Sequence, residues 1–229
     1  MSELRKLFDK YECDKGSKHG YEKAYEPFFE PLKYKEINIL EVGVWKGQGL
    51  EVLKDYFPNA QIYGIDIFTR PEEIVVQVGE KIVNSAISNR SMNPSEISVL
   101  SNENVHWAKC DSTASNCSSI ITNTFGKDIQ FDIIIDDGLH QPEANALTLK
   151  NLWPLLKDNG IYFVEDVWPL DRMTYSQIAN HWWLKKKKHI YNDFKYNIFL
   201  QELEDKNVER LDLRGYPDSY IFKVMKNEK

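Results

Sequence analysis

Short apolar runs alternate with helix-type patterns along most of this chain. Continuous apolar runs at residues 37–44, 61–67, 105–108, 131–136 and 160–165 predict buried strands. A short helix is predicted at 50–56, and a longer one at 142–156, where apolar residues recur at helical spacing. Apolar strands separated by helices indicate a parallel sheet covered on both faces.

The C-terminal part predicts a different strand arrangement. Two further strand-like runs, at 208–213 and 219–224, flank the turn-forming sequence Arg-Gly-Tyr-Pro-Asp at 214–218, so we expect an antiparallel hairpin at the sheet edge. The predicted fold is therefore α/β, Rossmann-like and doubly wound. Its sheet is mostly parallel and seven-stranded, with an antiparallel C-terminal hairpin strand.

Two segments lie outside the regular alternation. Residues 1–34 are polar and aromatic and favour helices, which predicts an N-terminal segment set against a main domain at 35–229. Residues 68–103 are longer than one crossover needs and are polar, so part of this insert is expected to be mobile. The pattern at 190–206 fits either a helix or a strand.

Composition and charge indicate a globular protein and argue against some kinds of partner. The 229 residues are 42% hydrophobic and 28% charged, which is typical of a globular chain, and the net charge of −6 argues against a nucleic-acid partner. Three cysteines without metal-ligand spacing indicate reduced thiols. The first residues lack a signal-peptide core and no apolar run approaches 18 residues, so we expect a cytoplasmic protein without a membrane span.

Acidic side chains stand at or just past the carboxyl end of every predicted parallel strand. In strand order they are Glu41, Asp66, Asp111, the pair Asp136 and Asp137, and the pair Glu165 and Asp166. Ligands of open parallel sheets bind outside the carboxyl ends of the strands. The sequence therefore predicts a functional site along this edge.

The loop after the first strand indicates which ligand is bound. A dinucleotide fold needs a glycine where this chain has Trp45, and the Lys-Ser/Thr signature of a P-loop is missing. The remaining glycines, Gly43, Gly47 and Gly49, suit a ligand with an adenosine but no pyrophosphate. Asp66 is placed to accept hydrogen bonds from two ribose hydroxyls, although a plain turn with a strand-end aspartate stays open.

The pattern Glu41-x-Gly43-x-x-x-Gly47, with Asp66 and Asp111 behind it, resembles the class I S-adenosylmethionine-dependent methyltransferases. The resemblance implies S-adenosyl-L-methionine as cofactor. The implied contacts are Glu41, Gly43 and Gly47 at the methionine end, Asp66 with Ile67 at the ribose, Asp111 with Ser112 at the adenine, and Asp136 on the cofactor side.

Two further motifs resemble a narrower group, the metal-dependent sugar O-methyltransferases of macrolide biosynthesis and bacterial glycan gene clusters. They are Asp136-Asp-Gly-Leu-His140 followed by Val164-Glu-Asp166, and the N-terminal Asp14-Lys-Gly-Ser-Lys-His-Gly-Tyr21, which is similar to a segment that covers the cofactor. One position departs from the group's pattern, because Gly49 stands where its members usually carry Ser or Thr.

The acids of the second half predict a metal site. Asp137, Glu165 and Asp166 would repel one another without a cation, and hard oxygen ligands suit Mg²⁺ or another hard divalent cation. His140, three residues after Asp137, is expected to act as the general base. Contacts to cofactor or substrate are also expected for His19, Tyr21, Tyr25 and Trp168.

The predicted activity is methyl transfer to a sugar hydroxyl of an activated sugar, a bacterial surface glycan or a natural-product glycoside. A non-sugar small molecule as acceptor and a non-catalytic S-adenosylmethionine-binding protein remain alternatives. A nucleic-acid amino methyltransferase is disfavoured, because Asp-Asp-Gly-Leu-His replaces the Asn/Asp-Pro-Pro-aromatic turn of such enzymes. The basic run Lys185–Lys188 has two interpretations. It either holds a diphosphate or phospholipid group of the substrate or forms a helix face exposed to solvent. Enzymes of this type are often homo-oligomers.

Overall fold

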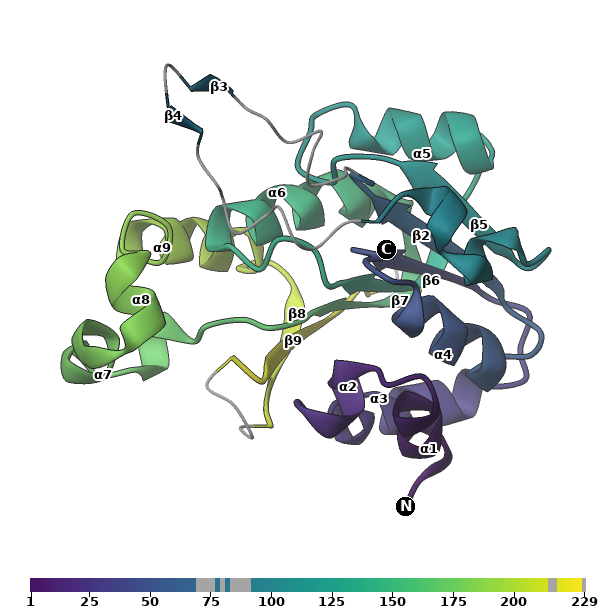
Figure 1. Ribbon diagram of the computed structural model, residues 1–229, viewed down its shortest axis with the longest axis horizontal. Coiled ribbons are helices and arrows are strands. Elements are labelled where there is room, and N and C mark those ends of the chain that lie inside the picture. The colour runs from purple at the N-terminus through teal and green to yellow at the C-terminus, as the bar shows by residue number, and fades with distance from the viewer. Residues whose placement is uncertain (69–76, 79–80, 83–91, 214–217, 228–229) are drawn as a thin grey trace.

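A mixed seven-stranded sheet forms the centre of the protein (Figure 1). The computed structural model describes residues 1–68, 77–78, 81–82, 92–213 and 218–227. The strands of the sheet are β1 (Asn38–Val42), β2 (Gln61–Asp66), β5 (Val105–Lys109), β6 (Phe131–Asp136), β7 (Leu156–Val164), β8 (Asn207–Asp212) and β9 (Tyr220–Met225). Their order is β5-β2-β1-β6-β7-β9-β8.

Strands β1, β2, β5, β6 and β7 are parallel, and β9 is antiparallel to both of its neighbours, β7 and β8. This arrangement confirms the predicted fold class, including the C-terminal hairpin. Residues 214–217 of the predicted turn lie outside the described residues. A separate antiparallel pair is formed by β3 (Gln77–Val78) and β4 (Lys81–Ile82).

Helices cover both faces of the sheet (Figure 1). One face is covered by α1 (Glu3–Lys10), α3 (Glu22–Phe29) and α4 (Gln48–Tyr56), with the short α2 (Asp14–Ser17) beside them. The other is covered by α5 (Cys117–Phe125), α6 (Pro142–Leu152) and α9 (Asp193–Glu202), while α7 (Tyr175–Asn180) and α8 (Trp182–Lys186) extend to the side. Short 3₁₀ turns are η1 (Glu30–Leu32), η4 (Pro94–Glu96), η5 (Ser98–Ser101), η6 (Trp153–Leu155) and η7 (Leu170–Arg172).

Alternating side chains of the strands divide the core in two. Ile39 and Ile133 point to the face covered by α4, whereas Leu40 and Ile134 point to the face covered by α6. All four are fully buried. Burial on both faces explains why these strands appear in the sequence as continuous apolar runs.

The N-terminal segment packs into the core of the sheet. Tyr25 and Phe29 of α3 are buried and stack on each other with ring centroids 4.8 Å apart. The Tyr25 ring also meets Phe163 of β7 edge-on at 4.9 Å. These contacts fix α2 and α3 beside the carboxyl edge of the sheet. The division at residues 34 and 35 stays a prediction.

Some element boundaries differ from those predicted. The helix expected to reach residue 156 ends at Leu152, because Pro154 lies in a 3₁₀ turn and removes a backbone donor. Strand β7 then begins at Leu156, before the expected residue 160, and includes Asn159 with a φ of 61° and a register shift opposite β6. Residues 193–202, left open from the sequence, are helical.

The insert is described in part. Residues 69–76, 79–80 and 83–91, on which its expected mobility falls, lie outside the described residues. Its last portion does belong to the core, since Ile97, Val99 and Leu100 are buried. Within the described part of the chain, no helix has the length and apolar character that a membrane span needs.

The turn after β1 brings two loops into contact. Gly43 has a φ of 90°, and a Cβ atom added to it would overlap the backbone carbonyl of Asp137, in the loop after β6. The residue must therefore be glycine both for its backbone conformation and for this close approach.

Gly43→Ala is predicted to lower the free energy of unfolding by more than Gly126→Ala. Gly126 also has a positive φ, 128°, but nothing lies within 4 Å of an added Cβ. Backbone strain alone costs about 1–3 kcal/mol, and overlap with a neighbouring backbone adds about 1–3 kcal/mol. Urea unfolding of both variants measures the difference. Equal losses of stability would contradict the close approach of the two loops.

Candidate active site

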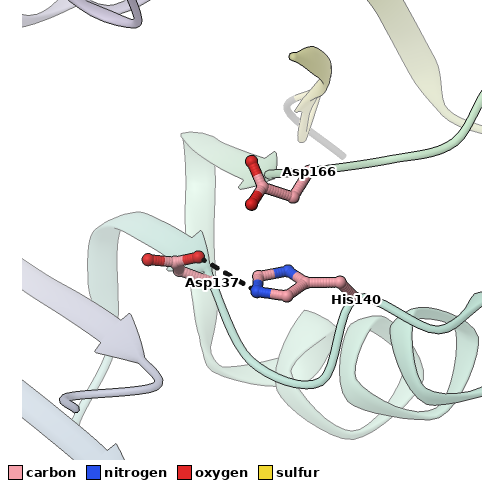
Figure 2. A group of neighbouring side chains, drawn as sticks. All are labelled: Asp137, His140 and Asp166. Atoms are coloured by element: carbon pink, nitrogen blue, oxygen red, sulfur yellow. Dashed lines mark ion pairs between the residues drawn. The ribbon is translucent and has the colours of Figure 1, made fainter. Parts of the chain in front are cut away.

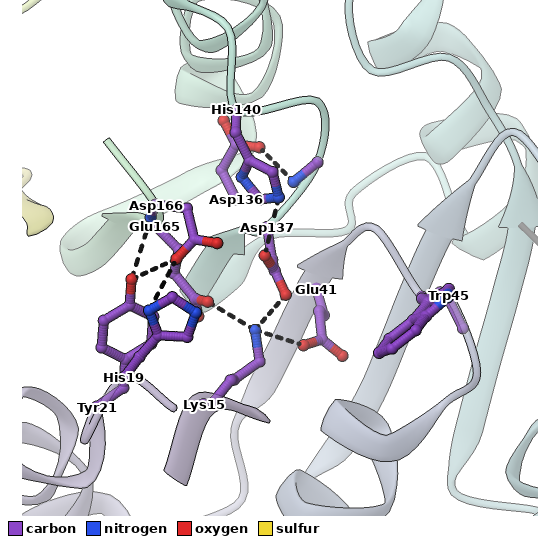
Figure 3. Close-up of polar contacts among 12 residues, drawn as sticks. Lys15, His19, Tyr21, Glu41, Trp45, Asp136, Asp137, His140, Glu165 and Asp166 are labelled. Atoms are coloured by element: carbon purple, nitrogen blue, oxygen red, sulfur yellow. Dashed lines mark hydrogen bonds and ion pairs between the residues drawn. The ribbon is translucent and has the colours of Figure 1, made fainter. Parts of the chain in front are cut away.

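Carboxylates from three strands converge at the carboxyl edge of the sheet (Figure 3). Glu41 lies near the end of β1, Asp136 and Asp137 at the end of β6, and Glu165 and Asp166 directly after β7. Because β1, β6 and β7 are adjacent and parallel, their ends bring these five acids together. The sequence predicted this gathering from the strand ends.

A group suited to a cation is formed by Asp137, His140 and Asp166 (Figure 2). Each offers one ligand atom, and these atoms all lie within 4.8 Å of one another. His140 Nε2 is 3.5 Å from Asp137 Oδ1, and His140 has a φ of 55°, the left-handed conformation that turns the chain back at this point. Among the described residues none forms a hydrogen bond with the buried Nδ1 of His140.

Glu165, the third predicted metal ligand, faces another way in this structure. Its Oε2 accepts a hydrogen bond from Lys15 Nζ at 2.7 Å, and its Oε1 accepts one from the Tyr25 hydroxyl. The side chain is 1% exposed. Both carboxylate oxygens of Glu165 are thus engaged by the N-terminal segment, whereas Asp137 and Asp166 also face His140.

The N-terminal segment supplies further contacts to the acids. The Tyr21 hydroxyl donates a hydrogen bond to Asp166 Oδ1. His19 Nδ1 lies 2.7 Å from the Ser219 hydroxyl and 3.7 Å from Asp166 Oδ1. The predicted contact residues His19, Tyr21 and Tyr25 are therefore buried side chains whose polar atoms meet the acid cluster.

Burial and neighbouring groups shift the pKa values of these acids in opposite directions. Burial raises the pKa of Glu41 to about 7 and that of Asp136 to about 7, and it raises the pKa of Glu165 well above its usual range. Burial alone would also raise the pKa of Asp166, but electrostatic interaction with His140 and His19, together with the Tyr21 hydrogen bond, lowers it. Asp166 therefore ionises more readily than Glu41, Asp136 and Glu165.

The glycine loop packs closely around Glu41. A Cβ atom added to Gly49 would overlap the Glu41 carboxylate in its present position. Among the described residues no donor reaches Glu41 Oε2, although this oxygen is buried. Gly47 caps the N-terminus of α4 with a φ of 83°.

Asp66 holds the same loop through its backbone. Its Oδ2 accepts hydrogen bonds from the N–H groups of Val44 at 2.8 Å and Trp45 at 3.1 Å, and its Oδ1 accepts one from Phe68 at 3.0 Å. Ile67, beside it, is half-buried. Asp66 thus orders the glycine loop, and its predicted contact to a ribose stays a prediction.

The residues predicted at the adenine lie after β5. Asp111 Oδ1 accepts from the backbone N–H of Thr113 at 2.9 Å, and the Ser112 hydroxyl lies 2.9 Å from the Thr148 hydroxyl of α6. Asp111 is exposed and Ser112 is half-buried. Both therefore stand at the same edge of the sheet, next to β2.

The remaining predicted residues lie between the edge and the α7–α8 extension. Trp168 is buried, and its ring meets that of His181 at 4.8 Å. Tyr191 donates a hydrogen bond to the His140 carbonyl at 3.1 Å, which ties this region to the acid edge. Lys186 and Lys187 lie over the rings of Trp182 and Trp183, so the basic run packs on its own aromatic neighbours.

Lys15 is the site residue that the sequence reasoning missed. Its buried ammonium group contacts Asp137 and Glu165 and lies 3.5 Å from Glu41 (Figure 3). Burial would lower the pKa of Lys15, but the three carboxylates outweigh it and raise the pKa well above its usual value. One feature of the sequence could have identified Lys15 as a site residue. It lies in the N-terminal motif at residues 14–21, which is similar to a segment that covers the cofactor.

The chain is similar to several known proteins. A family described as "Methyltransferase domain" matches residues 40–167. Demethylmacrocin O-methyltransferase of Streptomyces fradiae is 25% identical and mycinamicin VI 2''-O-methyltransferase of Micromonospora griseorubida is 26% identical, each over 72% of this chain. The crystallised MycE methyltransferase from the mycinamycin biosynthetic pathway, in complex with Mg and SAH, has a TM-score of 0.62 at 21% identity.

The share of the protein length covered by these matches differs between this chain and its relatives. The aligned region covers 36% of each of the two curated relatives. The MycE superposition covers 99% of this chain and 55% of that one. This chain therefore spans about a third of the length of the curated relatives it matches, and the likeness to MycE shows a shared fold.

Glu41→Gln is predicted to flatten the pH dependence of stability in metal-free buffer. A carboxyl group whose folded pKa is raised from 4.5 to about 7 contributes stability that is complete below its unfolded pKa and is lost as the pH rises through 7. The loss for Glu41 amounts to about 3 kcal/mol at most. Chemical unfolding of the wild type and the variant between pH 5 and pH 8 measures it.

The matched control is Glu103→Gln, because Glu103 is exposed. Its stability curve should run parallel to that of the wild type. If the Glu41→Gln curve is also parallel, burial does not raise the pKa of this carboxyl.

Proposed function

This chain belongs to the methyltransferase domain family, and from that membership we propose that it transfers a methyl group from S-adenosyl-L-methionine to a sugar hydroxyl, with help from Mg²⁺. The sequence had already suggested a likeness to sugar O-methyltransferases of macrolide biosynthesis, and that resemblance is confirmed by the relatives found. The proposed acceptor is an activated sugar, a bacterial surface glycan or a natural-product glycoside.

The observation that carries the proposal is the contact between two loops. The glycine loop after β1, which holds Gly43 and Gly47, touches the loop after β6 at Asp137. A cofactor bound on the first loop and a cation bound beside the second would be neighbours. Such an arrangement suits transfer of a methyl group to an oxygen held near the cation.

The donor set fits a hard divalent cation. Asp137 and Asp166 offer carboxylate oxygens, which Mg²⁺ prefers, and these oxygens lie within 4.8 Å of each other. We propose that Asp137, Glu165 and Asp166 hold the ion. In this set Glu165 gives up one of its present contacts, with Lys15 or Tyr25. A bound divalent cation supplies acidification of a coordinated hydroxyl.

The edge also fits the cofactor. Glu41 Oε2 is a buried acceptor without a donor among the described residues, and Gly49 leaves the space in which this carboxylate lies. We propose that Glu41, Gly43 and Gly47 contact the methionine part, Asp66 and Ile67 the ribose, and Asp111 and Ser112 the adenine. S-adenosylmethionine supplies a methyl group already activated by its sulfonium charge.

His140 is proposed as the general base. Its Nε2 faces Asp137 at 3.5 Å, and its Nδ1 has no partner among the described residues, so one ring nitrogen can hold a proton while the other accepts one. The Tyr191 hydroxyl fixes the backbone at His140. The imidazole is thus held at the acid edge, where the acceptor hydroxyl would lie.

The relatives support a sugar acceptor. Two further relatives, both of Streptomyces olivaceus, are named as 3'- and 2'-O-methyltransferases of rhamnosyl tetracenomycin C. This chain spans only about a third of the length of those proteins. Its own acceptor is therefore proposed as a sugar hydroxyl, and the molecule that carries the sugar is left unnamed. The buried Trp168, two residues after Asp166, is proposed to form part of the wall beside it.

His140→Ala is predicted to lower methyl transfer at least 100-fold, since general bases contribute about 10²–10⁴-fold, while the affinity for Mg²⁺ changes less than threefold. The assay follows methyl transfer from S-adenosylmethionine to a panel of nucleotide sugars and glycosides, with Mg²⁺ or with EDTA. Calorimetry with Mg²⁺ and with S-adenosylhomocysteine reports binding.

His189→Ala is the matched control, because His189 is exposed and outside the acid edge. It should keep wild-type turnover. Near-normal turnover of His140→Ala would rule out the base, and a joint loss of turnover and Mg²⁺ affinity would instead identify His140 as a metal ligand. Absence of S-adenosylhomocysteine binding to the wild type would overturn the whole proposal.

A further inference from the structure

Lys15 is a buried lysine surrounded by the acids of the proposed metal site. It lies in the short helix α2 and is 5% exposed. Its Nζ donates hydrogen bonds to Asp137 Oδ2 and to Glu165 Oε2, and lies 3.5 Å from Glu41 Oε1 (Figure 3). A single ammonium group thus contacts carboxylates at the ends of three different strands, β1, β6 and β7.

The two oxygens of Asp137 face different side chains. Oδ2 faces Lys15, whereas Oδ1 lies 3.5 Å from His140 Nε2, on the side where Asp166 completes the candidate metal group. Asp137 therefore stands between Lys15 and the position proposed for the divalent ion. In Figure 3, Lys15 and His140 lie on opposite sides of Asp137.

Buried carboxylates so close together repel one another unless a cation compensates them. Tyr25 and Tyr21 supply hydrogen bonds to Glu165 and Asp166, but a neutral hydroxyl adds no positive charge. Lys15 supplies that charge directly to Asp137 and Glu165. The N-terminal segment thereby contributes the cation that balances the edge of the sheet.

We propose that Lys15 is a positioning residue, an internal cation that holds Asp137 and Glu165 in place before the divalent ion binds and lowers the affinity of the site for that ion. The inference rests on the proposed function and deepens it. Because Lys15 also lies beside Glu41, it connects the proposed metal ligands to the carboxylate proposed at the methionine end of the cofactor.

The two effects of Lys15 have opposite signs, which makes the proposal testable. Without the ammonium group the metal-free protein holds uncompensated buried charge, so its stability falls. The same uncompensated charge attracts a divalent cation more strongly, so affinity for Mg²⁺ rises. A lysine that merely filled space would give the first effect without the second.

The test compares Lys15→Met with the wild type. In EDTA, the melting temperature of Lys15→Met is expected to fall by about 5–15 °C, from the usual cost of breaking a buried ion pair in a chain of this length. Calorimetric titration with Mg²⁺ is expected to show at least fivefold tighter binding. Saturating Mg²⁺ should recover at least half of the lost melting temperature.

Two more variants complete the design. Lys15→Met with Glu165→Gln removes both charges of one pair and should recover at least half of the loss in EDTA, which also provides a folded protein if the single variant does not fold. Lys33→Met is the matched control, because Lys33 is equally buried but pairs with Glu3, away from the edge. Its affinity for Mg²⁺ should equal that of the wild type.

Unchanged or weaker Mg²⁺ binding by Lys15→Met would overturn the proposal, as would a melting temperature in EDTA within 2 °C of the wild type. A double variant no more stable than Lys15→Met would overturn it too. If the wild type binds no Mg²⁺, the metal-dependent function fails, and with it the effect of Lys15 on metal affinity. The EDTA comparison then still decides whether Lys15 stabilises the acid cluster.

Discussion

Mutual repulsion among buried and half-buried carboxylates is the constraint on which this structure depends. Parallel strands β1, β6 and β7 end side by side and bring Glu41, Asp137 and Glu165 to one edge. The helices on the two faces of the sheet contribute apolar contacts to the core, whereas this edge needs positive charge. The balance comes from the N-terminal segment, whose Lys15 reaches the acids while its aromatic residues pack into the core. Core packing and charge compensation therefore fix the same segment in place.

The geometry of the site follows from two loops that meet. Gly43 allows the glycine loop to touch the backbone of Asp137, and Asp66 holds the same loop through backbone N–H groups. A proposed cofactor loop and a proposed metal loop are thus parts of one rigid arrangement. In such an arrangement the distance between donor and acceptor is set by the sheet, which favours a transfer reaction that needs alignment of its reactants.

The sequence predicted the sheet and its acidic edge, because local periodicity and strand-end chemistry carry that information. It could not predict where each carboxylate points. Asp66 binds the backbone of its neighbouring loop. Glu165 binds Tyr25, which lies 140 positions away in the sequence, and Lys15, which lies 150 positions away. The boundary of β7 was wrong for a local reason, since Pro154 and the positive φ of Asn159 interrupt an otherwise simple pattern. Lys15 was missed because a lysine in a polar segment looks solvated until the fold buries it.

The central claim is that a divalent cation binds among the carboxylates of this edge, beside the glycine loop. Anomalous diffraction from crystals grown with Mn²⁺ and S-adenosylhomocysteine tests it most directly. The account predicts one strong manganese peak in contact with Asp137 and Asp166, with S-adenosylhomocysteine against Gly43 and Gly47. S-adenosylhomocysteine bound at that loop without manganese at the acids would contradict the claim.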